Sequence, residues 1–187
     1  MTRAILLALL FVLTPAIGNA QQNAFVTVAP QPEYYAWWLR AEYHPFGTEV
    51  RGIPVARIRA SWCKANEFRK DMFPPELAES FPGDNRSFAI DGFFDGSKTS
   101  QTALVGVYET CEGERGAFLL VLARSKDKLP AIRFVVEIPG EHEFALVYRV
   151  NASTIGVYHC MECDHVSKFK WNRKRRTFVL LPPDPDE

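Results

Sequence analysis

The second half of the chain consists of short apolar segments separated by turn clusters, and this spacing restricts the fold more than any other feature. The segments are rich in Val, Ile, Leu, Phe and Tyr, and they end at turns such as Asp95-Gly96-Ser97 and Pro139-Gly140-Glu141. A spacing of roughly ten to fourteen residues leaves no room for the crossovers that parallel strands require. The sequence therefore predicts an antiparallel meander. The predicted strands are 87–93, 102–109, 117–124, 131–138, 144–150, 154–160, 163–171 and 177–181.

Two architectures fit such a meander: a sheet rolled into a sandwich or partial barrel, or two blades of a propeller-like array. A complete propeller needs at least about four blades of four strands, which this chain of 187 residues is too short to supply. The composition, 47% hydrophobic and 24% charged, is ordinary for a folded domain and excludes a disordered or collagen-like chain. We therefore expect a mainly β fold built from a rolled antiparallel sheet.

The first half of the chain predicts two further elements. Aromatic and apolar residues alternate with other residues over 35–43, and this period of two indicates a strand. Ile58, Trp62 and Ala65 recur at steps of four and three, and Met72 follows seven residues later. That spacing predicts one amphipathic helix near 61–71 with Ser61 as its N-cap.

The N-terminus has the pattern of a secretory signal peptide. Arg3 precedes an unbroken apolar run, residues 4–13, and small residues lead to a predicted cleavage after Ala20. The alternative, an uncleaved membrane anchor, is disfavoured because a membrane-spanning helix needs about 20 apolar residues. We expect a periplasmic or secreted protein, soluble after signal cleavage. Its predicted parts are a signal peptide at 1–20, a flexible arm at 21–32, a single β-rich domain at 33–181 and an acidic Pro-rich tail at 182–187.

The charge balance narrows the choice of partner. The chain carries 22 Lys plus Arg and 22 Asp plus Glu, for a formal net charge of zero. A general nucleic-acid binder gains its affinity by neutralising phosphates, so this balance argues against nucleic acid. The expected partner is an unknown protein or a component of the cell envelope.

The four cysteines predict disulfides, because their number is even and the chain is expected to be exported. Three connectivities are possible. Cys160 and Cys163 flank what the sequence predicts to be a two-residue hairpin turn, where facing strands are close enough to be bridged. That pairing leaves Cys63 with Cys111, a bridge that would hold the predicted helix to the sheet.

The second cysteine pair also allows other chemistry. His159, Cys160, Cys163 and His165 could bind zinc, and the two thiolates with Met161 could bind copper. Sequence neighbours on a strand point to opposite faces, so only subsets of these ligands would converge. A structural disulfide is the favoured interpretation, and a metal site and a redox-active dithiol are the alternatives.

Residues 91–105 resemble the calcium loop of FG-GAP and VCBS repeats, in which a strand enters an Asp- and Gly-rich loop and an apolar strand follows. By that resemblance Asp91 and Asp95 would lie near calcium ligands, and Ser97 and Thr99 would stand where further acidic ligands usually occur. Calcium prefers several carboxylates. A plain glycine-containing turn is the favoured interpretation, and a calcium site is the alternative.

A basic run with interleaved aromatic residues occupies 168–176 and could contact an anionic surface. Tyrosines and tryptophans near residue 38 could form a stacking platform. The predicted binding surface consists of Tyr34, Trp38, Lys168, Lys170 and Arg175. For the basic run, an ordinary solvated face and turn is the favoured interpretation, and contact with an anionic surface is the alternative.

No nucleophile elbow, zinc-protease motif or phosphate-binding loop is present in the sequence, and we predict no catalytic residue. The leading hypothesis is an exported, disulfide-stabilised binding or structural module of the cell envelope. The alternative is a periplasmic metal-binding or thiol/disulfide protein centred on Cys160 and Cys163, and a hydrolase of envelope polymers is the third possibility.

Overall fold

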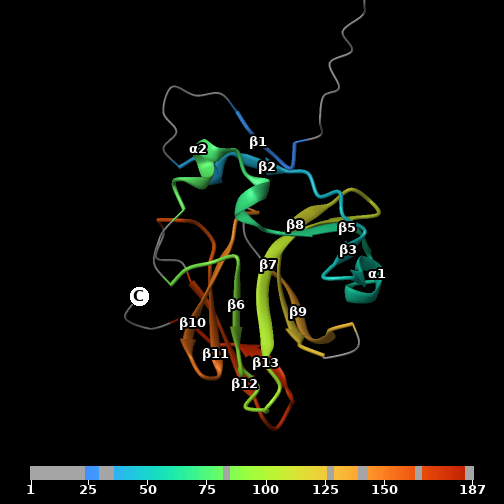
Figure 1. Ribbon diagram of the computed structural model, residues 1–187, viewed down its shortest axis with the longest axis vertical. Coiled ribbons are helices and arrows are strands. Elements are labelled where there is room, and N and C mark those ends of the chain that lie inside the picture. Colours follow the sequence, from blue (N-terminus) through green and yellow to red (C-terminus); the bar gives the residue numbers. More distant parts are fainter. Residues whose placement is uncertain are drawn as a thin grey trace, which may run out of the picture.

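The computed structural model describes residues 24–29, 36–81, 85–125, 129–138, 143–162 and 166–183. These residues form two main antiparallel sheets that pack face to face in a sandwich (Figure 1). The predicted signal peptide lies outside the described residues, as do most of the predicted arm and the end of the tail.

The first main sheet is organised around one long strand. β7 (Gln101–Thr110) pairs with β8 (Arg115–Ala123) along one edge, and β8 pairs in turn with β9 (Ala131–Ile138). Two shorter strands share the other edge of β7. β6 (Ala89–Gly92) pairs with its beginning and β5 (Trp62–Glu67) with its end.

The second main sheet is a simple meander of β10 (Leu146–Asn151), β11 (Thr154–Tyr158), β12 (Val166–Asn172) and β13 (Thr177–Leu180). An antiparallel bridge between Ser87 and Val147 joins the two sheets at one edge. The mainly β, antiparallel fold expected from the sequence is confirmed, and each of the eight predicted strands matches one of these elements with ends that differ by at most three residues.

The core lies on both faces of the first sheet. Alternate residues of β7 and β8, such as Val105 and Leu119, face the second sheet, where they pack with Val157. The other residues of the same strands, such as Leu104 and Leu120, face a second apolar cluster. Three short elements supply residues to that cluster: β3 (Glu49–Val50), β4 (Ile53–Pro54) and α1 (Val55–Ile58). Burial on both faces explains why β7 and β8 are almost continuously apolar in sequence.

Aromatic rings fill one end of the sandwich, beneath the N-terminal segments. These segments are β1 (Val26–Val28), η1 (Trp37–Leu39), β2 (Ala41–Tyr43), η2 (Lys70–Met72) and α2 (Pro75–Ala78), drawn near the top of Figure 1. Trp37 contacts the rings of Phe73 and Phe144 at centroid distances of 5.9 and 5.5 Å. Edge and tilted ring contacts of this kind stabilise a core beyond the area they bury.

The helix predicted near 61–71 is wrong, because Trp62–Glu67 forms strand β5. The pairing of β5 with β7 shifts register between Trp62 and Lys64, which marks a bulge at Cys63. An extra residue in a strand brings residues three apart onto one face, and both Trp62 and Ala65 pack in the second cluster. Because of this bulge, Trp62 and Ala65 share one face of a strand at the spacing that is typical of a helix.

The strand predicted over 35–43 is also largely wrong. Only Ala41–Tyr43 is extended, while Trp37–Leu39 forms a 3-10 turn after Ala36, which has a left-handed backbone with φ of 54°. Both tryptophans are buried in the same cluster, which strict alternation on a strand would not allow.

Candidate functional site

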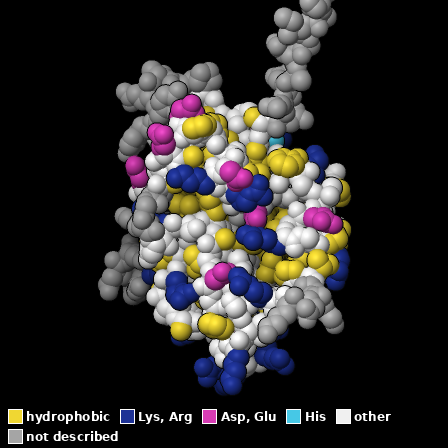
Figure 2. Space-filling model, viewed as in Figure 1, with side chains coloured by type: hydrophobic (Ala, Val, Ile, Leu, Met, Phe, Trp, Pro, Cys, Tyr) yellow, Lys and Arg dark blue, Asp and Glu magenta, His cyan; other side chains and the backbone are white. Residues whose placement is uncertain are grey.

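Basic side chains gather at the end of the sandwich opposite the aromatic rings. The loop 93–100, between β6 and β7, and the turn 173–176, between β12 and β13, lie together there (Figure 1). Figure 2 shows Lys and Arg side chains grouped at this lower end, with no acidic side chain beside the lowermost of them. We call this surface the basic end. Its exposed cations are Lys98, Arg133, Arg149, Arg173, Lys174, Arg175 and Arg176.

The loop 93–100 is held in shape by a buried glutamine. The side chain of Gln101 is 0% exposed and accepts a hydrogen bond from the Asp95 backbone N–H at 3.2 Å. Its amide group donates to the Thr99 carbonyl at 3.0 Å and to the Ser97 hydroxyl at 3.3 Å. The Asp95 carboxylate accepts the Ser97 backbone N–H at 2.8 Å. These bonds make the loop a rigid base for the cations around it.

Replacing Gln101 with leucine is expected to lower the free energy of unfolding by about 2 kcal/mol, because partly buried backbone groups of the loop lose their partner. Urea unfolding followed by tryptophan fluorescence would measure the loss. Thr99→Ala is the matched control, since only the backbone of Thr99 takes part in the bonds with Gln101. Equal stability of the two variants would contradict the role given to Gln101.

Three arginines from separate segments converge on this loop. Arg133 of β9 places Nε 3.8 Å from the Asp95 carboxylate, and Arg149 of β10 donates to the Asp91 carbonyl. The Arg149 guanidinium lies 5.5 Å from the centre of the Phe94 ring. Arg173 approaches Gly96, where an added Cβ would lie 3.8 Å from Nη2. The site is thus assembled from residues far apart in sequence.

Asp95 is the one acidic residue of the loop, and its environment favours the ionised form. Burial acts in the opposite direction, but hydrogen bonds with Ser97 and Gln101 and the charge of Arg133 lower the pKa of Asp95 below its usual range. A folded-state pKa below the unfolded one contributes stability above the unfolded value, and this stability is lost as the pH falls through the folded value. The loop therefore keeps a negative charge at neutral pH that orients Arg133.

The residues predicted as a calcium loop separate into two groups. Asp95, Ser97 and Thr99 come together around Gln101. The Asp91 carboxylate instead accepts hydrogen bonds from the Thr102 hydroxyl at 2.6 Å and from Arg124 at 3.0 Å. Because arginines surround the loop, the local charge favours an anion over a divalent cation.

The predicted binding surface is only partly exposed. Trp38 is 5% exposed within the aromatic end, so its placement on a surface platform is wrong, because the turn before η1 directs it inward. Tyr34 lies outside the described residues. Lys170 and Arg175 are exposed and Lys168 is half-buried. Both lysines lie on β12, which leads into the basic end.

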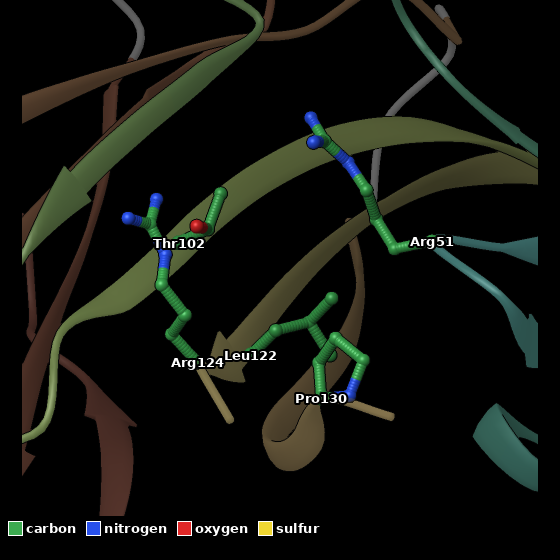
Figure 3. A pocket seen from close by; sticks show the side chains of 5 residues that line it. All are labelled: Arg51, Thr102, Leu122, Arg124 and Pro130. Carbon is green, nitrogen blue, oxygen red and sulfur yellow. The ribbon is translucent and has the colours of Figure 1, made fainter. Parts of the chain in front are cut away.

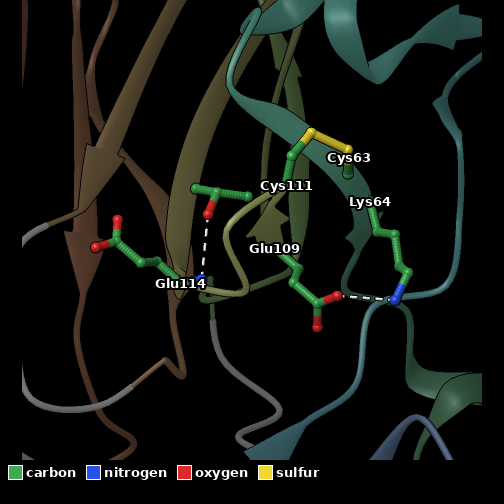
Figure 4. The surroundings of a disulfide bond; sticks show 6 residues. Cys63, Lys64, Glu109, Cys111 and Glu114 are labelled. Atoms are coloured by element: carbon green, nitrogen blue, oxygen red, sulfur yellow. Dashed lines mark hydrogen bonds and ion pairs between the residues drawn. A yellow bond between two sulfur atoms is a disulfide. The ribbon is translucent and has the colours of Figure 1, made fainter.

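Of the cysteines, Cys63 and Cys111 form the predicted disulfide, with Cα atoms 5.0 Å apart. The bridge ties the beginning of β5 to the turn after β7, beside an ion pair between Lys64 and Glu109 at 2.7 Å (Figure 4). The expected bridge from a helix to the sheet is not what the structure shows, because the residues predicted as a helix form strand β5. The disulfide joins the ends of two strands.

Residues 159–161 of the second cysteine region are buried. Cys160 is disulfide-bonded and 5% exposed, while Cys163 and His165 lie outside the described residues. His159 is also buried, and its Nε2 lies 2.9 Å from the Ser167 hydroxyl. Among the described residues no three His, Cys, Asp or Glu side chains are grouped so that they could hold a metal ion.

Sequence reasoning missed Arg133 and Arg149. Each is an isolated cation in an otherwise apolar or mixed strand, and nothing in its neighbours indicates a site. The sequence does show one arginine in each of the segments that form β9 and β10. Only the topology shows that both arginines approach the loop 93–100.

Comparison with known proteins finds no matching family model, no matching curated protein and no matching solved structure. In the part of the chain that the structure describes, no helix has the length and apolar character needed to cross a membrane. The function must therefore be argued from the geometry of the basic end.

Proposed function

We propose that the protein is an exported binding module of the cell envelope, and that its basic end binds an anionic polymer there. The observation that carries this proposal is the convergence of cations from four separate segments on one rigid, exposed end. Arginine is suited to this task because its planar guanidinium binds carboxylate and phosphate groups with paired hydrogen bonds.

Two features support export. The first twenty residues have the charge, apolar run and small residues of a signal peptide. The disulfide between Cys63 and Cys111 is typical of proteins that fold in an oxidising compartment.

The distribution of charge supports a polymer as the partner. Whole-chain charge is zero, so the positive field is local to the basic end. Cations spread over a loop, a turn and two strands can contact several repeating anionic groups at once. Each contact releases counterions from a densely charged polymer, which increases affinity at low salt.

A double variant tests the proposal. Arg173→Gln with Arg175→Gln is expected to weaken binding to fluorescent polyphosphate or polyglutamate about tenfold at low salt, and to reduce the dependence of affinity on salt concentration. Fluorescence anisotropy would measure both effects. We choose these two arginines because both are exposed residues of the turn.

The matched control is Arg57→Gln with Lys70→Gln, which removes two exposed cations on other parts of the molecule. It should bind like the wild-type protein. Equal losses in the two double variants would mean that binding follows overall charge, and wild-type affinity in the Arg173 and Arg175 variant would contradict the proposed site.

A further inference from the structure

A separate pocket of about 130 Å³ opens on the outer face of the first sheet. Arg51, from the turn between β3 and β4, lies on one side, and Arg124, which follows β8, lies on the other. Among the described residues, Thr102, Leu122 and Pro130 also line it. Figure 3 shows the two guanidinium groups on either side of the space above Leu122, with the Thr102 hydroxyl beside Arg124.

Both guanidinium groups are oriented by carboxylates outside the pocket lining. Arg124 donates through Nη2 to Asp91 at 3.0 Å, and Asp91 is itself held by the Thr102 hydroxyl at 2.6 Å. Arg51 donates through Nε to Glu67 at 2.6 Å. Each ion pair uses one nitrogen of its arginine. The other N–H groups of the two guanidiniums form no further hydrogen bond or ion pair with the described residues.

The pocket combines these donors with an apolar floor. Leu122 is 3% exposed and belongs to the second apolar cluster, and Pro130 is half-buried beside it. A ligand that uses both features carries an anionic group next to an aliphatic one. A volume of about 130 Å³ is comparable to that of a cavity that binds a benzene-sized molecule, which suits one small residue and not a large ring system.

The charge of the surroundings selects among anions. Two arginines and two carboxylates sum to a formal charge near zero, so a dianionic phosphate would be repelled by Asp91 and Glu67 as well as attracted by the arginines. A monoanionic carboxylate meets less repulsion and matches the fork of N–H donors on a guanidinium.

We propose that this pocket binds the free carboxylate of a peptide C-terminus with a small aliphatic side chain, the carboxylate between Arg51 and Arg124 and the side chain on Leu122 and Pro130. Capture of a terminal carboxylate is a known mode of peptide recognition. This inference does not depend on the anionic-polymer proposal, because the basic end and the pocket use different arginines.

The test titrates the mature, disulfide-bonded protein with N-acetyl-leucine and follows backbone amide resonances by NMR. Resonances of Thr102, Leu122 and Arg124 should shift together with an affinity in the millimolar range, which is typical of so small a ligand. N-acetyl-leucinamide, which lacks the charge, should bind at least about tenfold more weakly. Equal binding of acid and amide would overturn the proposal without any variant.

Variants locate the site. Arg51→Gln and Arg124→Gln, each confirmed as folded by circular dichroism, should each weaken N-acetyl-leucine binding about tenfold, whereas Arg57→Gln and the Arg173 and Arg175 double variant should not. Wild-type affinity in both pocket variants would overturn the proposal. Tighter binding of inorganic phosphate than of N-acetyl-leucine would overturn the assignment to a carboxylate.

Discussion

Replacing both Cys63 and Cys111 with alanine is expected to lower the free energy of unfolding by about 4 kcal/mol. The two residues are 48 positions apart, and their bridge closes a long loop in the unfolded chain. In the chain-entropy model, opening a loop of that size stabilises the unfolded state by about this amount. Urea unfolding of the oxidised wild-type protein and of the variant would measure the difference.

The folded structure should survive this change at low denaturant, because strand β5 retains its pairing with β7 and the contacts of Trp62 with the second apolar cluster. Reduced wild-type protein is a useful comparison, but it also loses the bridge at Cys160. The double variant isolates the long loop. An unfolding midpoint unchanged from that of the oxidised protein would show that the bridge contributes nothing to stability.

The β meander was predictable because its signals are local. Each strand of the second half is short, apolar and followed by turn residues, so its existence does not depend on distant contacts. The nearly continuous apolar sequence of β7 and β8 could have indicated that these strands are buried on both faces. What covers the outer face could not be predicted, because β3, β4 and α1 are each too short to have a recognisable pattern.

The helix prediction failed for the opposite reason. Trp62 and Ala65 share a face only because of a bulge at Cys63, and a bulge is specified by pairing with β7 and not by the strand itself. Periodicity alone assigns the same spacing to a helix. The bridge between Cys63 and Cys111, in contrast, was predicted from the even number of cysteines and from the hairpin turn expected between Cys160 and Cys163. Neither signal depends on whether residues 61–71 form a helix or a strand.

The candidate site was visible in the sequence only as two unrelated pieces. One was a loop that resembles a calcium site, and the other was the basic run that ends in the turn 173–176. The topology places them at one end of the sandwich, and it adds Arg133 and Arg149 from two other strands. The charge of these arginines argues against the calcium site that the resemblance implied, because the loop forms part of a cationic surface.

Gly106→Ala is expected to destabilise the protein strongly, although it removes no contact. The loss comes from the added methyl group. Gly106 lies in β7 opposite Glu67, where the strand passes from its pairing with β6 to its pairing with β5. An added Cβ would collide with the backbone carbonyl oxygen of Asn66 and lie 2.8 Å from the Glu67 Cα. Both are backbone atoms, so neither can move away by changing a rotamer, and β5 must separate from β7.

We expect Gly106→Ala to lower the free energy of unfolding by about 3 kcal/mol, at the upper end of the usual cost of overpacking a core. Gly113→Ala is the control. Its φ of 89° disfavours alanine, but nothing lies within 4 Å of the added Cβ, so we expect a loss of only about 1 kcal/mol. Urea unfolding ranks the two variants, and hydrogen exchange at the amides of residues 64–68 should accelerate in Gly106→Ala alone. If Gly106→Ala is no less stable than Gly113→Ala, then β5 does not pack against β7 as closely as the structure places it.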